Sequence, residues 1–292
     1  MEIDIGRREF VRGAGAFAAC AGLGGCGTFA SLSPLEYENN LRDRCWVWGH
    51  DTGQVDGEKN GWGLDVGKVD YPIGEGARFL GCPNIKVIRW GVPDESYLEQ
   101  FRDAKRVTWL LGQDTKALKQ NGEFAFSLVN KMPNLIGFDV DDYLSGKNDM
   151  VGQVPALRKR IDSAGRKMEL HAVLYTMQLE DPRVVPAMEA VDVVSLWTWK
   201  APDLAKLREN FRRYRELLPN KRTLLGIYLF DFGRHLPMPM DMMEKQLSDA
   251  LALYKEGEIE GFVFLCTSIF NRDFPTIALT RDWIRRHASE SR

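Results

Sequence analysis

Several residue patterns that mark other classes of protein are scarce in this sequence. Only 5 cysteines occur in 292 residues. The three that follow the N-terminal region, Cys45, Cys82 and Cys266, have no CxxC spacing, which excludes a zinc-site signature and a disulfide framework. We expect these three side chains to be buried as small hydrophobic residues.

Charge and hydropathy exclude two further classes. The chain has 39 Lys and Arg against 41 Asp and Glu, a net charge of −2, so it has no overall basic field to hold nucleic acid. After the N-terminal region, no apolar run approaches the roughly 20 residues that a membrane-spanning helix needs. We therefore expect no nucleic-acid partner and no membrane span in the body of the chain.

Length and composition suit a single folded body. The chain is 44% hydrophobic, 27% charged and 11% aromatic, which excludes a disordered, collagen-like or coiled-coil chain. A (β/α)₈ barrel needs roughly 250 residues, so one barrel with a short appendage fits the length.

The N-terminal residues have the pattern of an export signal. The pair Arg7-Arg8, with Phe10 two positions on, precedes a small, weakly apolar run over residues 13–25. A charged start followed by a short apolar region is typical of a signal peptide. The arginine pair resembles a twin-arginine export signal.

The signal ends in a second recognisable motif. Leu23-Gly24-Gly25-Cys26 resembles a bacterial lipobox, which implies that Cys26 is lipidated and becomes the mature N-terminus. We expect a signal over residues 1–26, a tether over 27–42 and a barrel over 43–292. The protein would be exported, periplasmic or at the cell surface, and would contact a membrane only through this lipid anchor.

The body alternates short β-rich runs with amphipathic stretches. The predicted strands are residues 44–50, 85–90, 106–111, 135–141, 169–175, 191–197, 223–230 and 261–267. The clearest predicted helices between them are residues 94–105, 115–131, 203–218 and 240–255. Strand-then-helix repetition implies parallel pairing, so the fold class is α/β. Since no Gly-rich nucleotide loop is present, a closed single (β/α)₈ TIM barrel is favoured over a doubly wound sheet, and no cofactor is expected.

Active sites of this fold lie at the carboxyl ends of the strands. Those ends are far more polar and aromatic here than the opposite ends. They carry a set of predicted substrate-binding residues: Trp48, His50, Arg89, Trp90, Asp139, Tyr175, Trp197, Trp199 and Tyr228. A long Gly-rich loop after the first strand, which contains Trp62, is either a substrate wall or a solvated excursion.

The fourth strand carries the most specific pattern. Alternation places two sets of side chains on opposite faces: Ile136, Phe138 and Val140 outward, and Gly137, Asp139 and Asp141 into the barrel. Two successive inward carboxylates are costly to bury without partners, and close like charges raise one pKa. Asp139 is either a substrate ligand or a structural acid paired with Arg89 or with backbone. Asp141 and Asp142, at the rim, are the stronger catalytic candidates.

Residues 137–143, Gly-Phe-Asp-Val-Asp-Asp-Tyr, resemble the strand-four motif of the family-18 chitinases, D-G-x-D-x-D-x-E. Gly137, Asp139 and Asp141 match the motif's Gly and last two Asp. Tyr143 stands at the position of the catalytic Glu, and Ile136 at that of the first Asp, so the family's proton donor is missing and its mechanism is not transferred. The chain is also similar to bacterial exported barrel proteins, a resemblance that implies the fold but no reaction.

The rim as a whole resembles that of retaining glycoside hydrolases with carboxylates on strands four and seven. The resemblance implies that Asp142, or Asp141, is the acid/base and that Asp231 is the nucleophile or activates water. Carboxyl groups about 5–5.5 Å apart would give retention of configuration, and about 6.5–9.5 Å would give inversion. We expect a carbohydrate substrate and no metal.

Two other classes stay open. A non-catalytic carbohydrate-binding lipoprotein on a degenerate barrel would keep the aromatic rim without needing the acids. A metal-dependent hydrolase would use His50, Asp139, Asp141 and His235 as ligands, although no HxH or HExxH spacing is present.

Overall fold

The computed structural model describes residues 36–51, 62–65, 71–142, 144–145 and 150–292. The predicted signal over residues 1–26, with Cys26, and the first part of the predicted tether lie outside the described residues. No helix within the described ranges is long and apolar enough to cross a membrane.

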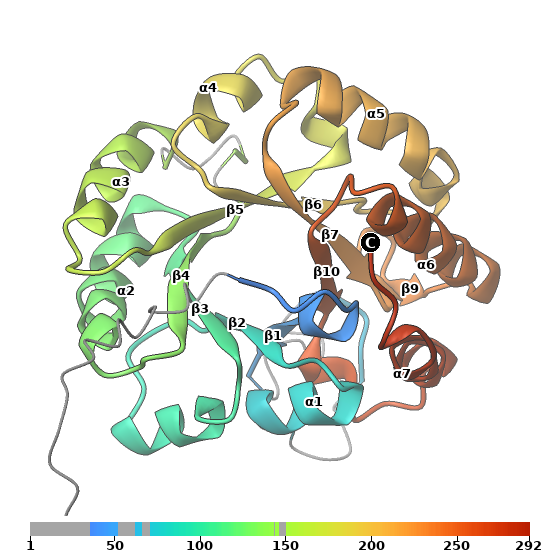
Figure 1. Cartoon of the computed structure of the whole chain (residues 1–292), viewed down its shortest axis with the longest axis horizontal. Coiled ribbons are helices and arrows are strands. Elements are labelled where there is room, and N and C mark those ends of the chain that lie inside the picture. The colour runs from blue at the N-terminus through green and yellow to red at the C-terminus, as the bar shows by residue number, and fades with distance from the viewer. Residues whose placement is uncertain (1–35, 52–61, 66–70, 143, 146–149) are drawn as a thin grey trace, which may run out of the picture. The chain divides into compact units, whose positions relative to one another are not determined.

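Eight parallel strands close into a barrel, as the alternating pattern predicts (Figure 1). Their order around the barrel is β1-β10-β7-β6-β5-β4-β3-β2, with β2 pairing back onto β1. The strands are β1 Cys45–His50, β2 Asn84–Ile88, β3 Arg106–Gly112, β4 Leu135–Val140, β5 Glu169–Tyr175, β6 Val193–Trp197, β7 Arg222–Tyr228 and β10 Gly261–Leu265. The fold is therefore the (β/α)₈ barrel that the sequence predicts.

Helices surround the strands on the outside of the barrel (Figure 1). They are α1 Ile73–Leu80, α2 Thr115–Ser127, α3 Val154–Asp162, α4 Val184–Met188, α5 Leu207–Leu217, α6 Met240–Lys255 and α7 Pro275–His287. The predicted helices at 115–131, 203–218 and 240–255 correspond to α2, α5 and α6. The first two are extended by the short 3₁₀ helices η4 (Leu128–Asn130) and η7 (Ala201–Lys206).

The predicted helix at 94–105 forms differently. The segment after β2 is a 3₁₀ helix, η3, over Glu95–Phe101. Phe101 packs edge-to-face against Trp109 of β3, with ring centroids 6.0 Å apart, and Tyr97 packs against both rings. These ring contacts hold the segment against β3. Its 3₁₀ winding is tighter than that of an α-helix and is common in short connecting helices.

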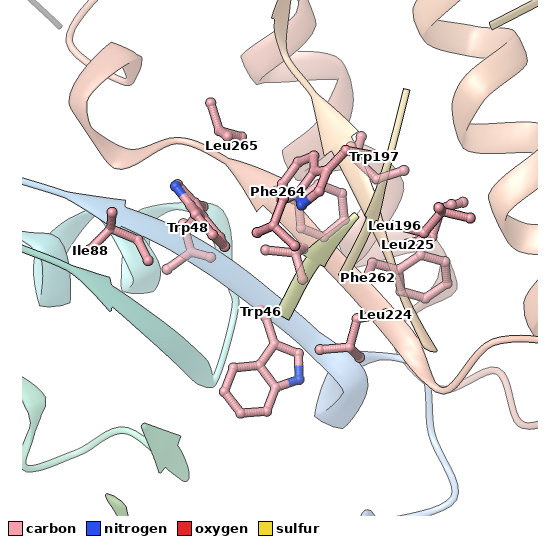
Figure 2. Packing of buried hydrophobic residues seen from close by; sticks show 14 of the residues in the cluster. Trp46, Trp48, Ile88, Leu196, Trp197, Leu224, Leu225, Phe262, Phe264 and Leu265 are labelled. Atoms are coloured by element: carbon pink, nitrogen blue, oxygen red, sulfur yellow. The ribbon is translucent and has the colours of Figure 1, made fainter. Parts of the chain in front are cut away.

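The layer between strands and helices is apolar. Phe138 of β4 stacks on Phe126 of α2 at 4.7 Å, as the predicted outward face of this strand requires. On the far side of the barrel, Phe262 and Phe264 of β10 pack against Trp283 of α7. Figure 2 shows part of this buried cluster together with Trp46 and Trp48, which project from β1.

The amino end of the barrel is closed by the residues that lead into β1. Tyr37 lies between the guanidinium groups of Arg44 and Arg106, 4.8 and 4.3 Å from its ring centroid, and its hydroxyl accepts a hydrogen bond from Trp46 Nε1. The Leu41 N–H donates to the carbonyl of Glu290 near the C-terminus. Residues 36–42, which fall within the predicted tether, therefore pack on the barrel, and both ends of the described chain lie at this end.

The three cysteines of the barrel are free and buried, as predicted. Cys45 and Cys266 lie in or beside β1 and β10, and Cys82 follows α1. They contribute to packing and form no disulfide.

Candidate active site

A cavity opens at the carboxyl ends of the strands. Its enclosed volume is about 100 Å³, within about 500 Å³ of empty space that includes the mouth. The lining residues are Trp48, His50, Trp62, Asp141, Asp142, Val173, Tyr175, Trp197, Trp199, Tyr228, Phe232 and Leu265. Most predicted rim residues thus meet in one place, which is where this fold places its active sites.

The end of β4 supplies both acidic groups of the cavity. Asp139 and Asp141 project into the barrel, as the alternation predicts, and Asp142 follows where the chain turns away. Asp142 has φ +47°, in the left-handed region. A residue other than glycine held there costs on the order of 1–3 kcal/mol, and such residues collect at functional sites. The turn directs two consecutive carboxyl groups to one cavity.

Both carboxyl groups have raised pKa values. Burial is the largest cause for Asp141, and repulsion from Asp142 and Asp139 adds to it. One oxygen of Asp141, Oδ1, is buried and has no hydrogen-bond partner. Burial also raises the pKa of Asp142, while a hydrogen bond from Tyr175 opposes the increase. A pair of this kind holds a proton in a pH range where an ordinary Asp has lost it.

Two tyrosines connect the acid pair to the opposite wall. The Tyr175 hydroxyl interacts with the Asp142 carboxyl and lowers its pKa, and Tyr228 adjoins Tyr175. Burial raises the pKa of both hydroxyls, so both stay protonated. Tyr175 is therefore the donor placed to act on Asp142.

His50 enters the cavity in a defined tautomer. Trp48 Nε1 donates to His50 Nε2 over 2.9 Å, so Nε2 carries no proton and the neutral ring carries its proton on Nδ1. Burial lowers the pKa of His50 to about 4, which agrees with a neutral ring. His50 Nδ1 is buried without a partner, so it is a free donor for a ligand oxygen.

Aromatic rings form the walls. Trp48 and Trp197 meet edge-to-face at 5.5 Å, and Trp199 contacts Trp62 at 5.8 Å and Tyr228 at 5.7 Å. Trp62 comes from the loop after β1 and lines the cavity, which agrees with the substrate-wall alternative. The rest of that loop, residues 52–61 and 66–70, lies outside the described residues.

A glycine makes room for one of these rings. A Cβ on Gly226 of β7 would lie 2.0 Å from Cε3 of Trp197. Only a residue without a side chain lets the indole of Trp197 lie flat against the neighbouring strand. The position of Trp197 in the wall therefore depends on Gly226.

Asp139 lies below the cavity and does not line it. Its Oδ1 accepts from Lys86 Nζ of β2 over 2.6 Å, and its Oδ2 accepts from Thr108 of β3. Asp139 is thus paired, as its interpretation as a structural acid requires, but its partner is Lys86 and not Arg89. Burial favours a raised pKa for Asp139, and the Lys86 and His171 charges outweigh it and lower the pKa.

Lys86 begins a polar chain through the barrel interior that the sequence reading missed. Lys86 Nζ also lies 2.9 Å from His171 Nδ1, and His171 Nε2 lies 3.0 Å from Glu169 Oε2. Arg222 then bridges Glu169 and Glu260. A lysine in the middle of the apolar strand Asn84–Ile88 is the signal that could have revealed it.

Three other predicted site residues lie outside the cavity. Arg89 pairs with Asp51 and stacks over Tyr97, 4.4 Å from its centroid. Trp90, which follows Arg89 in the sequence, is 41% exposed.

Asp231 is the third of these residues, and its position bears most on the mechanism. It lies in β8 (Phe230–Asp231), which pairs antiparallel with β9 (Leu236–Pro237). Its Oδ1 accepts from the Arg234 N–H over 3.1 Å. The chain leaves the barrel wall after Tyr228 and enters this hairpin, and the predicted nucleophile is not among the residues that line the cavity. Its Oδ2 is buried and has no hydrogen-bond partner.

The metal-ligand alternative does not assemble. Asp139 is paired with Lys86, and His235 packs against the ring of Trp62 at 5.5 Å. Within the described parts of the chain, no group of three or more His, Cys, Asp or Glu side chains is arranged to hold a metal ion.

Comparison with known proteins identifies solved structures of the same fold but no relative by sequence. Neither a family model nor a curated protein matches the sequence. Solved structures of similar fold include glycoside hydrolases. A chitinase domain from Pyrococcus furiosus has a TM-score of 0.55 at 12% identity, covering 85% of this chain and 97% of that one.

Two other neighbours carry different sugar specificities. The GH99 endo-alpha-mannosidase from Bacteroides thetaiotaomicron has a TM-score of 0.55 at 10% identity, covering 85% of this chain and 98% of that one. The beta-glucuronidase from Ruminococcus gnavus has a TM-score of 0.52 at 8% identity, covering 84% and 50%. At these identities the likeness shows the shared barrel fold alone.

Proposed function

We propose that this protein is a glycoside hydrolase whose sugar lies in the cavity above β4. One observation carries the proposal: two adjacent carboxyl groups of raised pKa, Asp141 and Asp142, face an aromatic-walled cavity at the carboxyl end of a (β/α)₈ barrel. Solved barrels of similar fold include a chitinase and an endo-alpha-mannosidase, which supports this choice of reaction.

The chemistry uses the proton that the acid pair retains. Asp142, held by Tyr175, gives this proton to the glycosidic oxygen as the C–O bond breaks. The carboxylate of Asp141 stabilises the positive charge that develops on the sugar ring. Water then adds to the anomeric carbon and returns a proton to Asp142, so the pair is restored. Asp231 is left out of this scheme because it does not line the cavity.

The other lining residues bind the sugar. His50 Nδ1 donates to a ring or hydroxyl oxygen, and the indoles of Trp48, Trp62, Trp197 and Trp199 offer faces on which sugar rings stack. No Lys or Arg lines the cavity among the described residues. The acidic sugar of a glucuronidase would therefore find no cation to pair with, and uronic acids are excluded from the proposal.

A second candidate is favoured by one observation. A two-carboxylate mechanism places acids on both sides of the scissile bond, whereas the acids that line this cavity among the described residues come from the end of β4. A barrel that binds carbohydrate without cleaving it would show the same aromatic walls.

One experiment separates the two. The chain with residues 1–26 removed is screened for hydrolysis of aryl glycosides and polysaccharides beside Asp142→Asn, Asp141→Asn and Asp231→Asn, with the exposed Asp103→Asn as a matched control. Turnover lost in the first two variants and kept in the last two supports the hydrolase. Binding of a glycan that survives every substitution, without turnover, supports the binding protein.

We further propose export and lipidation through the N-terminal motifs. Arg7-Arg8 and the Leu23–Cys26 lipobox support this location. Replacing both arginines with lysine should retain the chain inside the cell, and Cys26→Ser should release the exported protein from membranes. Cell fractionation with mass spectrometry of the N-terminal peptide tests both steps, and an unlipidated, cytosolic native chain would rule them out.

A further inference from the structure

The charges around the cavity are unbalanced. Asp141 and Asp142 line it, and no described Lys or Arg does. The nearest interior cation, Lys86, is fully buried and already engaged, with Asp139 Oδ1 at 2.6 Å and His171 Nδ1 at 2.9 Å. Arg89 is engaged by Asp51 outside the cavity. Among the described residues, no Lys or Arg therefore lines the cavity to pair with the acid pair.

The cavity also cannot generate a cation from its histidine. His50 Nε2 accepts the Trp48 indole N–H, and a protonated ring would place two donors against each other. At the same time, Asp141 Oδ1 is buried and unpartnered. An acceptor of this kind leaves a place for a hydrogen-bond donor, and a positively charged donor suits it best.

The walls suit a cation as well. Trp48 and Trp197 line the same cavity as Asp141, and Trp62, Trp199, Tyr228 and Phe232 contribute further aromatic surface. Faces of tryptophan and tyrosine attract ammonium groups through the negative face of the ring, more strongly where water is excluded. Carboxylate and aromatic faces around one small cavity are the chemistry that recognises organic ammonium groups.

We infer that the sugar taken by this cavity carries a protonated amine, which Asp141 and the indole faces of Trp48 and Trp197 hold. The inference rests on the proposed function, since it names the sugar class of that site. The ammonium pairs with the ionised carboxyl group of Asp141, while Asp142 keeps the proton that the proposed reaction uses. Ammonium binding therefore favours the state in which the retained proton lies on Asp142.

The titratable and charged groups that face Asp141 come from five strands. Asp139 and Asp142 belong to β4 and its end, Lys86 to β2, and the others are Tyr175 of β5, Tyr228 of β7 and His50 of β1. The two tyrosines and the histidine are neutral at physiological pH, and Lys86 and Asp139 compensate each other. The pH dependence of ligand binding should therefore follow the acid pair.

Calorimetry on the full chain, kept in mild detergent, tests the inference with three matched disaccharides. They are the β-1,4-linked glucosamine disaccharide, its N-acetylated form and cellobiose, which differ only in ammonium, acetamide or hydroxyl at C2. Tetramethylammonium serves as a cation without a sugar and without a titrating proton. We expect the glucosamine disaccharide to bind at least about tenfold more tightly than the other two sugars.

The variants and the pH series test whether Asp141 causes the preference for the amino sugar. Asp141→Asn should remove the tenfold preference for the glucosamine disaccharide, while the exposed Asp103→Asn should leave that preference unchanged. The affinity for tetramethylammonium should rise from pH 5 to pH 8 in the wild type, as the acid pair loses its proton, and should rise less in Asp141→Asn.

Each other outcome overturns the inference. It is wrong if a neutral disaccharide binds as tightly as the amino form, if neither ammonium ligand binds, or if tetramethylammonium binds and no amino sugar does. Hydrolysis of a neutral glycoside without amine preference would overturn the inference and keep the hydrolase. Amine-selective binding without hydrolysis of any panel member would keep the amine preference and remove the hydrolase.

Discussion

Removing Lys86 tests whether the interior of the barrel is held by charge. Lys86 and Asp139 are 0% and 1% exposed, and their charged atoms lie 2.6 Å apart. Lys86→Met keeps an unbranched side chain of similar length but leaves Asp139 with Thr108 and no cation. A carboxylate buried in this way is strongly destabilised unless it takes up a proton.

The expected loss of stability is large. Removing one partner of a buried ion pair costs roughly 3–5 kcal/mol, because the remaining charge is uncompensated. For a domain of this size, each kcal/mol lowers Tm by roughly 2–4 °C, so Lys86→Met should lower Tm by about 6–20 °C. The double variant Lys86→Met/Asp139→Asn removes both charges and should recover at least half of the loss.

The loss should also depend on pH. The lowered pKa of Asp139 in the native protein contributes stability above its unfolded pKa that is lost as pH falls. Without Lys86, burial raises this pKa instead, so the variant loses stability as pH rises. The Tm difference between wild type and Lys86→Met should therefore be larger at pH 8 than at pH 5.

Thermal unfolding followed by circular dichroism measures these differences. Lys245→Met, which removes a half-exposed partner of Asp249 in α6, is the control and should cost about 1 kcal/mol or less. A loss below about 1 kcal/mol for Lys86→Met, or a double variant that loses the sum of the single variants, would refute the reasoning.

Three further predictions concern the cavity. Asp141→Asn should raise Tm at pH 8 and leave it nearly unchanged at pH 5, because the raised pKa of Asp141 makes its ionised form cost stability as pH rises through that pKa; an unchanged or lower Tm at pH 8 would contradict this. Gly226→Ala should displace the Trp197 indole, at a cost of about 1–3 kcal/mol and with weaker ligand binding, measured by unfolding and by calorimetry; wild-type affinity would show that Trp197 is not part of the binding wall. Tyr175→Phe removes the donor that lowers the pKa of Asp142, so the basic limb of the pH–activity profile should move to higher pH; an unmoved profile would exclude Asp142 as the group that titrates.

The sequence was sufficient for those features that depend on neighbours along the chain. Alternation along residues 135–141 predicts that Phe138 packs outward and that Asp139 and Asp141 point inward, and both hold. The carboxyl ends of the strands gather by the closure of the barrel alone, so Trp48, His50, Tyr175 and Trp197 could be assigned to one rim without knowing any contact between them.

The features that failed depend on contacts between distant segments. Asp139 was expected to bind substrate or, as a structural acid, to pair with Arg89 or with backbone. Which cation reaches it depends on the level that each strand occupies in the barrel, and there Lys86 faces it across β3. Asp231 was expected at the rim because the apolar run continues to Phe230. The wall strand ends at Tyr228, and Asp231 pairs in the β8–β9 hairpin and is not among the residues that line the cavity.

The closed amino end of the barrel gives the molecule a fixed polarity. Tyr37, Arg44 and Arg106 seal that end, and the described chain enters there, opposite the cavity. Nine residues lie between Cys26 and Glu36, and these ten residue steps span at most about 36 Å when extended. A chain running from a lipid on Cys26 would therefore join the barrel at its sealed end and not at the end that carries the cavity.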